Sequence, residues 1–166
     1  EPSTKAENKI VRILWCTTLK IDFINQYKNI ISKFINQTDK VQIKIRCHPQ
    51  VDIREFIKTS VSPSEAKQIE FSTSTSIHDD LMNCDAVLTS SGSTVFLDAI
   101  IAKKPILNLI NNDYFMGDLG ESEMIKIRTD GDLKTAMEQI SQRKFHINEY
   151  SDLLNTNQKV WQNILN

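Results

Sequence analysis

The sequence is poor in glycine and cysteine, and it has no long apolar run. Its 166 residues include only four glycines, Gly92, Gly117, Gly120 and Gly131, whose spacing excludes the G-x-G-x-x-G turn and the P-loop as phosphate-binding devices. The three cysteines are far apart and odd in number, which excludes a disulfide framework and is typical of buried reduced thiols in a cytosolic protein. No apolar stretch approaches the roughly 18 residues that a membrane-spanning helix requires.

An excess of charge of one sign and metal-binding motifs are also missing. The chain has 20 Lys and Arg against 21 Asp and Glu, so its net charge of −1 gives no electrostatic reason to expect nucleic acid as a partner. His48, His78 and His146 form no H-x-x-x-H pattern, and the cysteines form no C-x-x-C pattern, so we expect no metal site. What remains is an ordinary globular composition, 40% hydrophobic and 25% charged, at a length that predicts one domain.

The sequence begins with a polar segment and no starting methionine. Its first residues, Glu1-Pro2-Ser3-Thr4-Lys5, indicate a domain excised from a longer protein. We expect residues 1–9 to be flexible and residues 10–166 to form the domain.

Short apolar runs rich in β-branched residues alternate with segments of helical periodicity. The runs predict six strands, over residues 10–16, 41–46, 68–72, 85–89, 105–110 and 124–128. Apolar residues at helical spacing predict helices over 20–36, around 53–57, from 76, over 92–103, from 130 and over 150–165. This order predicts an α/β fold, a Rossmann-like doubly wound parallel sheet of about six strands with helices on both faces.

The loop after the fourth predicted strand is rich in small hydroxyl side chains. Sheets of this kind bind ligands at the carboxyl ends of their strands. Ser91, Ser93 and Thr94 offer hydroxyl donors there, and Gly92 lets the backbone approach a ligand closely. The start of the following helix exposes unpaired N–H groups, so the loop predicts a phosphate or diphosphate site without a glycine-rich turn. The alternative is that these residues only cap the helix.

A histidine follows the second predicted strand at the same edge of the sheet. His48, directly before Pro49, can donate to a phosphate oxygen or act as a general acid. The alternative is a surface histidine in a proline turn. Arg46 points to the same face if the strand continues, although it can pair with an acid instead.

Other loops at this edge supply weaker candidates. Asp98 lies two turns into the helix after the hydroxyl loop and can accept hydrogen bonds from a ribose diol, or it is a solvated acid favoured by the helix dipole. Ser74, Thr75 and Ser76 can present backbone groups to a base, or they form only a flexible loop. Two residues after the first strand are candidates for a supporting role: Thr17 and Thr18.

Together these segments resemble the C-terminal, donor-binding domain of GT-B glycosyltransferases. The resemblance rests on the strand that ends in His48-Pro49, on residues 85–95 about 40 residues later, and on Asp98-Ala99 followed by Lys104-Pro105-Ile106. The His-Pro and paired-Ser version is most similar to enzymes that make bacterial surface polysaccharides. These are sialyltransferase-like and capsule transferases that use CMP-activated sugars, and polyol-phosphate transferases that use CDP-glycerol. The likeness covers roughly residues 9–108.

The resemblance implies roles for the candidate residues. His48 would be catalytic, contacting the donor phosphate or assisting its departure. Asp98 stands where the family commonly has a ribose-binding Glu, which is one methylene longer. The implied ligand is a nucleotide-activated sugar, with no cofactor and no metal. The implied phosphate-binding residues are Ser90, Ser91, Gly92, Ser93 and Thr94.

The resemblance also implies a place for the chain in a larger enzyme. It would be the donor-binding half of a glycosyltransferase or polyol-phosphate transferase of capsule, lipopolysaccharide or other surface polysaccharide synthesis. The acceptor and the catalytic base would come from an N-terminal domain that this chain lacks. The implied location is cytoplasmic, and peripheral association of the full-length enzyme with the inner face of the membrane is compatible with it. We expect the domain alone to bind a nucleotide weakly and to lack transferase activity.

Two other interpretations stay open. The UDP-sugar 2-epimerase type shares the two-domain architecture, but it would need a Ser-Gly-Gly loop and a ribose-binding Glu, where this chain has Ser91-Gly92-Ser93 and Asp98. The second is a non-catalytic doubly wound module for protein interaction, in which the serine-rich loops serve only as helix caps.

Overall fold

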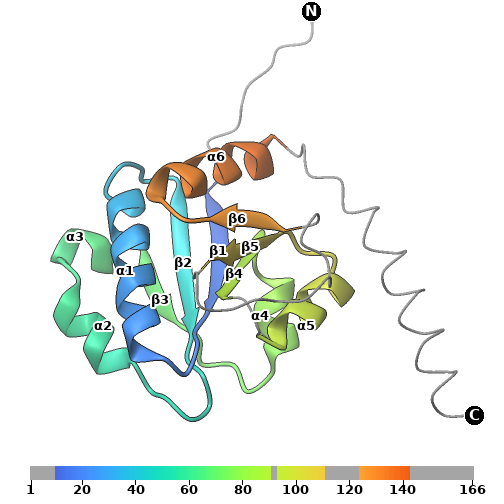
Figure 1. The fold of residues 1–166 in the computed structure, drawn as a ribbon, viewed down its shortest axis with the longest axis horizontal. Helices are drawn as coiled ribbons and strands as arrows, with labels where there is room; N and C mark the ends of the chain where they lie inside the picture. The colour runs from blue at the N-terminus through green and yellow to red at the C-terminus, as the bar shows by residue number, and fades with distance from the viewer. Residues whose placement is uncertain (1–9, 91–92, 111–123, 143–166) are drawn as a thin grey trace, which may run out of the picture.

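The computed structural model describes residues 10–90, 93–110 and 124–142 (Figure 1). The predicted flexible segment 1–9, residues 111–123 and the predicted helix 150–165 lie outside the described residues. The elements, in chain order, are β1 (Val11–Cys16), α1 (Ile21–Ile35), β2 (Val41–Arg46), α2 (Arg54–Ser60), α3 (Pro63–Ala66), β3 (Ile69–Phe71), α4 (Ile77–Met82), β4 (Ala86–Ser90), α5 (Val95–Ile101), β5 (Ile106–Leu109), β6 (Ile125–Ile127) and α6 (Asp130–Ser141).

The strands form one parallel sheet in the order β3-β2-β1-β4-β5-β6. Every neighbouring pair is parallel. The chain winds outward from β1 in one direction and from β4 in the other, so the winding direction reverses between these two strands. The predicted Rossmann-like doubly wound fold is confirmed.

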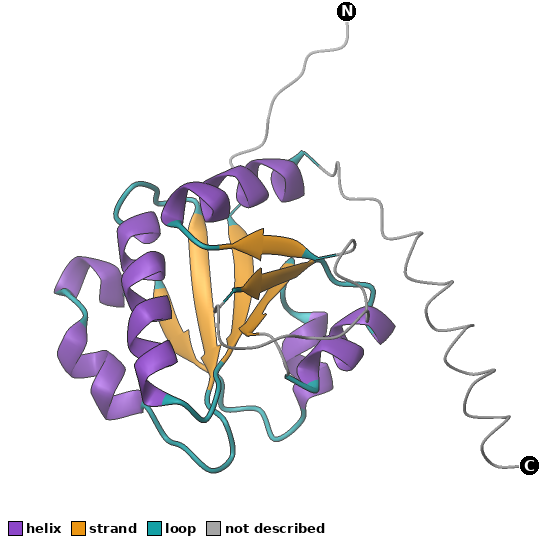
Figure 2. Cartoon of the chain, viewed as in Figure 1, coloured by secondary structure: helices purple, strands orange, loops and turns teal. Residues whose placement is uncertain are grey.

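Helices cover both faces of the sheet, with α1 and α6 on one face and α4 and α5 on the other (Figure 2). Side chains alternate between the faces along each strand. In β1, Trp15 packs into the core under α1 with Tyr27, whereas Leu14 packs into the second core with Phe96 of α5. Because both faces of the sheet are covered, the central strands are nearly continuous apolar runs in the sequence.

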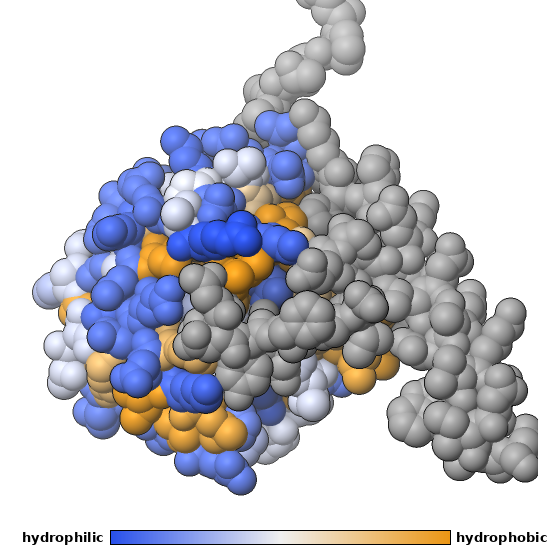
Figure 3. All heavy atoms as spheres, viewed as in Figure 1, coloured by the Kyte–Doolittle hydropathy of each residue, from blue (hydrophilic) through white to orange (hydrophobic). Residues whose placement is uncertain are grey.

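The exposed surface is largely hydrophilic on the face shown in Figure 3, with apolar patches between the polar residues. Leu19 and Ile21, at the start of α1, are among the large apolar side chains that are about half exposed. Within the described ranges, no helix is both long enough and apolar enough to cross a membrane.

Two helices differ from their predicted form. Helical spacing over residues 20–36 predicts an apolar stripe that includes Phe23 and Ile30. In the structure the buried stripe of α1 includes Ile24 and Ile35, whereas Phe23 and Ile30 only pack against its edge. Helix α5 is shorter than the predicted 92–103, since Val95 is its first residue and the chain turns away after its C-cap. The residue after the C-cap, Lys103, adopts a left-handed φ of 54°, which cannot continue a helix.

The start of α4 also departs from the predicted pattern. Ser76 is the N-cap as expected, but its hydroxyl accepts from the N–H of His78. The spacing of Ser76 and Asp79 is typical of a capping box, but Asp79 instead accepts a hydrogen bond from the hydroxyl of Ser74 at 2.9 Å. The hydroxyls of Ser74 and Ser76 therefore bond to the first turn of α4.

Candidate functional site

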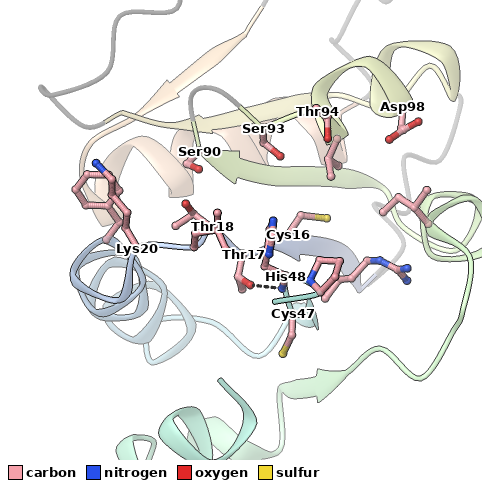
Figure 4. Close-up of a pocket in the computed structure, with 16 residues that line it drawn as sticks. Cys16, Thr17, Thr18, Lys20, Cys47, His48, Ser90, Ser93, Thr94 and Asp98 are labelled. Atoms are coloured by element: carbon pink, nitrogen blue, oxygen red, sulfur yellow. Dashed lines mark hydrogen bonds between the residues drawn. The ribbon is translucent and has the colours of Figure 1, made fainter. Parts of the chain in front are cut away.

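A cavity of about 560 Å³ lies at the carboxyl ends of β1, β2 and β4 (Figure 4). Its volume lies in the range of roughly 300–1,000 Å³ that is usual for small-molecule sites. It lies where the winding of the sheet reverses, the position at which the fold class predicts a ligand. The structure brings eight sequence-predicted residues to its lining: Thr17, Thr18, Arg46, His48, Ser90, Ser93, Thr94 and Asp98.

The remaining predicted residues do not join this group. None of Ser74, Thr75 and Ser76 is among the described residues that line the cavity. Their contact with a base stays a prediction. Ser91 and Gly92 lie outside the described residues.

Two sets of side chains face each other across the cavity. Figure 4 shows Ser90, Ser93, Thr94 and Asp98 along one side, with Thr17, Cys47 and His48 along the other. The backbone N–H of Ser93 donates to the carbonyl of Ser90 at 3.3 Å, which keeps these two residues close together on their side of the cavity. Within the described part of the chain, the Thr94 side chain makes no capping hydrogen bond. Thr94 is nevertheless the N-cap residue of α5, so its hydroxyl faces the cavity without taking part in the cap.

The His48 side is a tight turn held to β1. The N–H of Val51 donates to the His48 carbonyl at 3.0 Å, closing the turn around Pro49. The N–H of His48 donates to the hydroxyl of Thr17 at 2.9 Å, and the N–H of Gln50 donates to His48 Nδ1 at 3.2 Å. Because Nδ1 accepts a hydrogen bond, the neutral imidazole holds its proton on Nε2. His48 can therefore present an N–H donor to the cavity.

Thr17→Val is expected to destabilise this turn. The Thr17 side chain is buried, and valine keeps its shape while leaving the His48 N–H without an acceptor. An unpaired buried donor costs about 1–3 kcal/mol, which should appear as a loss in the free energy of unfolding in urea. Thr18→Val, next in the chain and only half-buried, is the matched control. Equal losses in the two variants would contradict the role given to Thr17.

Positive charge at the cavity comes from two side chains. Its described lining contains one lysine and one arginine, Lys20 and Arg46. Lys20 Nζ lies 4.9 Å from the centre of the Phe23 ring, and Figure 4 places Lys20 at the opposite end of the cavity from Asp98. The sequence interpretation did not include Lys20. Its place in the loop after β1 is the one sequence signal that could have identified it.

Arg46 is paired with an acid, one of the two alternatives left by the sequence. Its Nη1 lies 2.6 Å from Asp80 Oδ2, and the Asp80 side chain is only 2% exposed. Asp80 also accepts a hydrogen bond from the Ser72 hydroxyl at 2.6 Å. Sequence reasoning missed Asp80, although it falls on the helical stripe of Ile77 and Leu81, and an acid on a buried stripe indicates a buried partner.

The three cysteines differ in burial, and Cys16 and Cys47 line the cavity whereas Cys84 does not. Burial raises the pKa of Cys16 to about 12, and burial raises the pKa of Cys84 to about 11. Both therefore stay protonated near neutral pH, where only the thiolate is a nucleophile. Cys47 is half-buried and lines the cavity. Among the described residues, no cluster of three or more His, Cys, Asp or Glu side chains could hold a metal ion.

Alkylation of the folded chain at pH 8 is expected to label Cys47 and to spare the other two cysteines. The raised pKa values and burial of Cys16 and Cys84 leave little accessible thiolate at this pH. Peptide mass spectrometry after brief treatment with iodoacetamide measures the label at each site. The same treatment in denaturant should label all three. Labelling of Cys16 as fast as Cys47 in the folded chain would contradict this expectation.

Comparison with known proteins finds the fold but no sequence relative. No protein-family model matches the chain, and no curated protein matches it. A solved structure of the glycotransferase of kitacinnamycin matches with a TM-score of 0.56 and 13% identity over 88% of this chain and 38% of that one. The pneumococcal O-GlcNAc transferase GtfA, in complex with UDP and GlcNAc, matches with a TM-score of 0.52 and 14% identity over 95% and 36%. A UDP-N-acetylglucosamine 2-epimerase matches with a TM-score of 0.55 and 16% identity over 89% and 42%.

These similarities confirm the predicted GT-B-like fold. The chain spans less than half the length of each of these proteins. The narrower resemblance to sialyltransferase-like and CDP-glycerol transferases stays a prediction.

Proposed function

We propose that this chain is the nucleotide-sugar donor-binding domain of a larger GT-B enzyme, a glycosyltransferase or polyol-phosphate transferase of bacterial surface polysaccharide synthesis. One observation carries the proposal: the cavity at the carboxyl edge of the sheet places the hydroxyls of Ser90, Ser93 and Thr94 opposite His48. A further domain would supply the acceptor site and the catalytic base. The proposed donor binding uses no metal.

The middle of the cavity has the chemistry of a phosphate site. Hydroxyls of Ser90, Ser93 and Thr94 can donate to phosphate oxygens from one side, and Nε2–H of His48 can donate from the other. Lys20 adds positive charge at one end. When the bond between sugar and phosphate breaks, negative charge grows on the departing phosphate. Donors already fixed around it stabilise that charge without reorganisation.

The Asp98 end of the cavity suits a ribose and a base. Asp98 lies four residues after Thr94, one turn along the same face of the chain around α5, and Figure 4 shows it beyond the hydroxyls. Its carboxylate can accept hydrogen bonds from a ribose diol. Ile77 and Val95 line the same cavity and offer apolar surface for a base.

Asp98→Ala is expected to weaken UDP binding about tenfold, since hydrogen bonds to a charged group contribute roughly 1.5–3 kcal/mol. Binding of inorganic pyrophosphate should stay unchanged, because it has no ribose. 2′,3′-Dideoxyuridine diphosphate should bind the wild type and the variant equally. Isothermal titration calorimetry with these three ligands measures the effect, and an equal loss for the dideoxy ligand would contradict a ribose contact.

The proposed function is tested by titrating the chain with UDP, CDP and CMP in a calorimeter, with inorganic phosphate as the reference ion. At least one nucleotide should bind more tightly than phosphate. Absence of binding by all three nucleotides would overturn the proposal.

A second candidate function is UDP-sugar 2-epimerisation, because the epimerase structure matches about as well as the transferases do. An epimerase converts its UDP-sugar without an acceptor. Incubating the full-length protein with UDP-N-acetylglucosamine alone distinguishes the two. Appearance of the 2-epimer would favour the epimerase, whereas transferase activity would require an added acceptor.

A further inference from the structure

The guanidinium of Arg46 holds the loop between β3 and α4, here called the β3–α4 loop (residues 72–76). Nη1 donates to the carbonyl oxygens of Ser74 at 3.1 Å and Ser76 at 3.3 Å, and Nη2 donates to that of Thr75 at 3.3 Å. Nη1 also donates to the carboxylate of Asp80 at 2.6 Å. One planar cation therefore joins three consecutive carbonyls of the loop to a buried acid on α4.

The β3–α4 loop is also bonded within itself. The N–H of Ser74 donates to the hydroxyl of Ser72 at 3.3 Å, and the N–H of Ser76 donates to the hydroxyl of Ser74 at 3.2 Å. The Ser72 hydroxyl in turn donates to Asp80 at 2.6 Å. The carbonyls of residues 74–76 are thus engaged by Arg46, and the N–H groups of Ser74 and Ser76 are engaged by loop hydroxyls. These hydrogen bonds hold the β3–α4 loop in one conformation.

The β3–α4 loop ends at the cavity. The residue that follows it, Ile77, is the first residue of α4 and lines the cavity, as does Val95 of α5. Both side chains pack against the same core cluster, and α4 contacts α5. The position of the loop therefore sets the position of Ile77 on the α5 side of the cavity, the side that carries Asp98.

We propose that Arg46 and Asp80 are positioning residues, which fix the β3–α4 loop and Ile77 as the nucleoside-side wall of the cavity. This wall makes the cavity select a nucleoside diphosphate over a bare diphosphate. The inference rests on the proposed function, since it assigns one wall of that same site. The Arg46 charge is matched by Asp80, so Arg46 acts through the loop and not as a phosphate ligand.

Arg46→Lys is the informative substitution. Lysine keeps the charge, but its ammonium is a compact point donor that cannot span the carbonyls and the acid as the planar fork does. Ser72→Ala is the milder second variant, because it removes one hydrogen bond to Asp80 and leaves the ion pair in place. Arg54→Lys is the matched control, since Arg54 is exposed and paired with Asp52 at 3.1 Å, away from the cavity lining.

Each variant is titrated with UDP and with inorganic pyrophosphate, after thermal melting has shown that it is folded. Arg46→Lys should weaken the affinity for UDP at least about tenfold and leave the affinity for pyrophosphate within about twofold of the wild type. Ser72→Ala should weaken the affinity for UDP about threefold. Arg54→Lys should change neither ligand. An equal loss of affinity for UDP and for pyrophosphate in Arg46→Lys would identify Arg46 as a phosphate ligand and overturn the inference. Unchanged UDP binding would overturn it as well.

Hydrogen exchange separates this inference from the proposed function. Arg46→Lys should speed exchange of the Ser74 and Ser76 amides in the absence of any ligand, while β1 amides keep their wild-type rates. Unchanged exchange in the β3–α4 loop would overturn the positioning role of Arg46, whatever the result of the nucleotide titration. If the wild-type chain binds no nucleotide, the proposed function fails and the assigned selectivity fails with it.

Discussion

Thr94→Glu is expected to weaken nucleotide binding roughly 100-fold while leaving the fold as stable as before or slightly more so. Thr94 is the exposed N-cap of α5 and lines the cavity. A carboxylate at a helix start gains about 0.3–1 kcal/mol from the helix dipole. The same carboxylate repels a diphosphate. Two unit charges about 5 Å apart interact by about 3 kcal/mol at an effective dielectric constant of about 20, which corresponds to a loss in affinity of roughly 100-fold.

Calorimetry with UDP and thermal unfolding measure the two effects on the same sample. Thr135→Glu is the matched control, because it makes the same change of charge at an exposed position on α6, outside the cavity lining. Salt screens charges beyond about 8 Å at physiological ionic strength, so UDP affinity should stay within about twofold in the control. If Thr94→Glu keeps wild-type affinity, the phosphate does not bind at the start of α5.

Asp80→Ala is expected to cost about 3–5 kcal/mol of the free energy of unfolding, the usual result when one partner of a buried ion pair is removed. The Asp80 side chain is 2% exposed, and its loss leaves Arg46 and Ser72 without their shared acceptor. The Arg46 side chain is 23% exposed and keeps some contact with water, so we expect a value near the lower end of that range. Urea denaturation monitored by circular dichroism measures it.

Asp79→Ala provides the comparison at the neighbouring position. Asp79 is exposed and accepts one hydrogen bond from the Ser74 hydroxyl at 2.9 Å, so its removal should cost no more than about 1 kcal/mol. Similar losses in the two variants would show that the Arg46–Asp80 pair has no special part in the stability of the fold.

Most of the fold could be predicted from the sequence because its strands are buried on both faces. β1 and β4 are apolar over most of their length because both of their faces are packed, whereas β2 alternates apolar with polar residues. Helix boundaries were less predictable. The hydroxyl segment before α5 suits a helix start at several positions, and the Ser90–Ser93 turn decides that the first helical residue is Val95. The buried stripe of α1 depends on how α1 packs against the sheet and α6, which its own periodicity does not specify.

The site could be predicted as far as the topology brings strand ends together. Thr17, His48 and Ser93 come from separate parts of the chain, and the parallel sheet places all three at one cavity. The Arg46–Asp80 pair could not be predicted in the same way, because the two residues are 34 positions apart and several other acids were equally available in the sequence. Pairing of side chains at that separation is decided by the packing of α4 against the sheet, which local sequence patterns do not encode.

The central claim is that a nucleotide binds at the carboxyl edge of the sheet, and amide chemical shifts test it most directly. The opposite edge offers an internal comparison, a groove of about 340 Å³ between α1 and α6 lined by Thr38 and Lys134. Titrating the isotopically labelled chain with UDP should shift the amides of His48, Thr94 and Asp98 and leave those of Thr38 and Lys134 unchanged. Shifts confined to the α1–α6 groove, or no shifts at saturating UDP, would contradict the account.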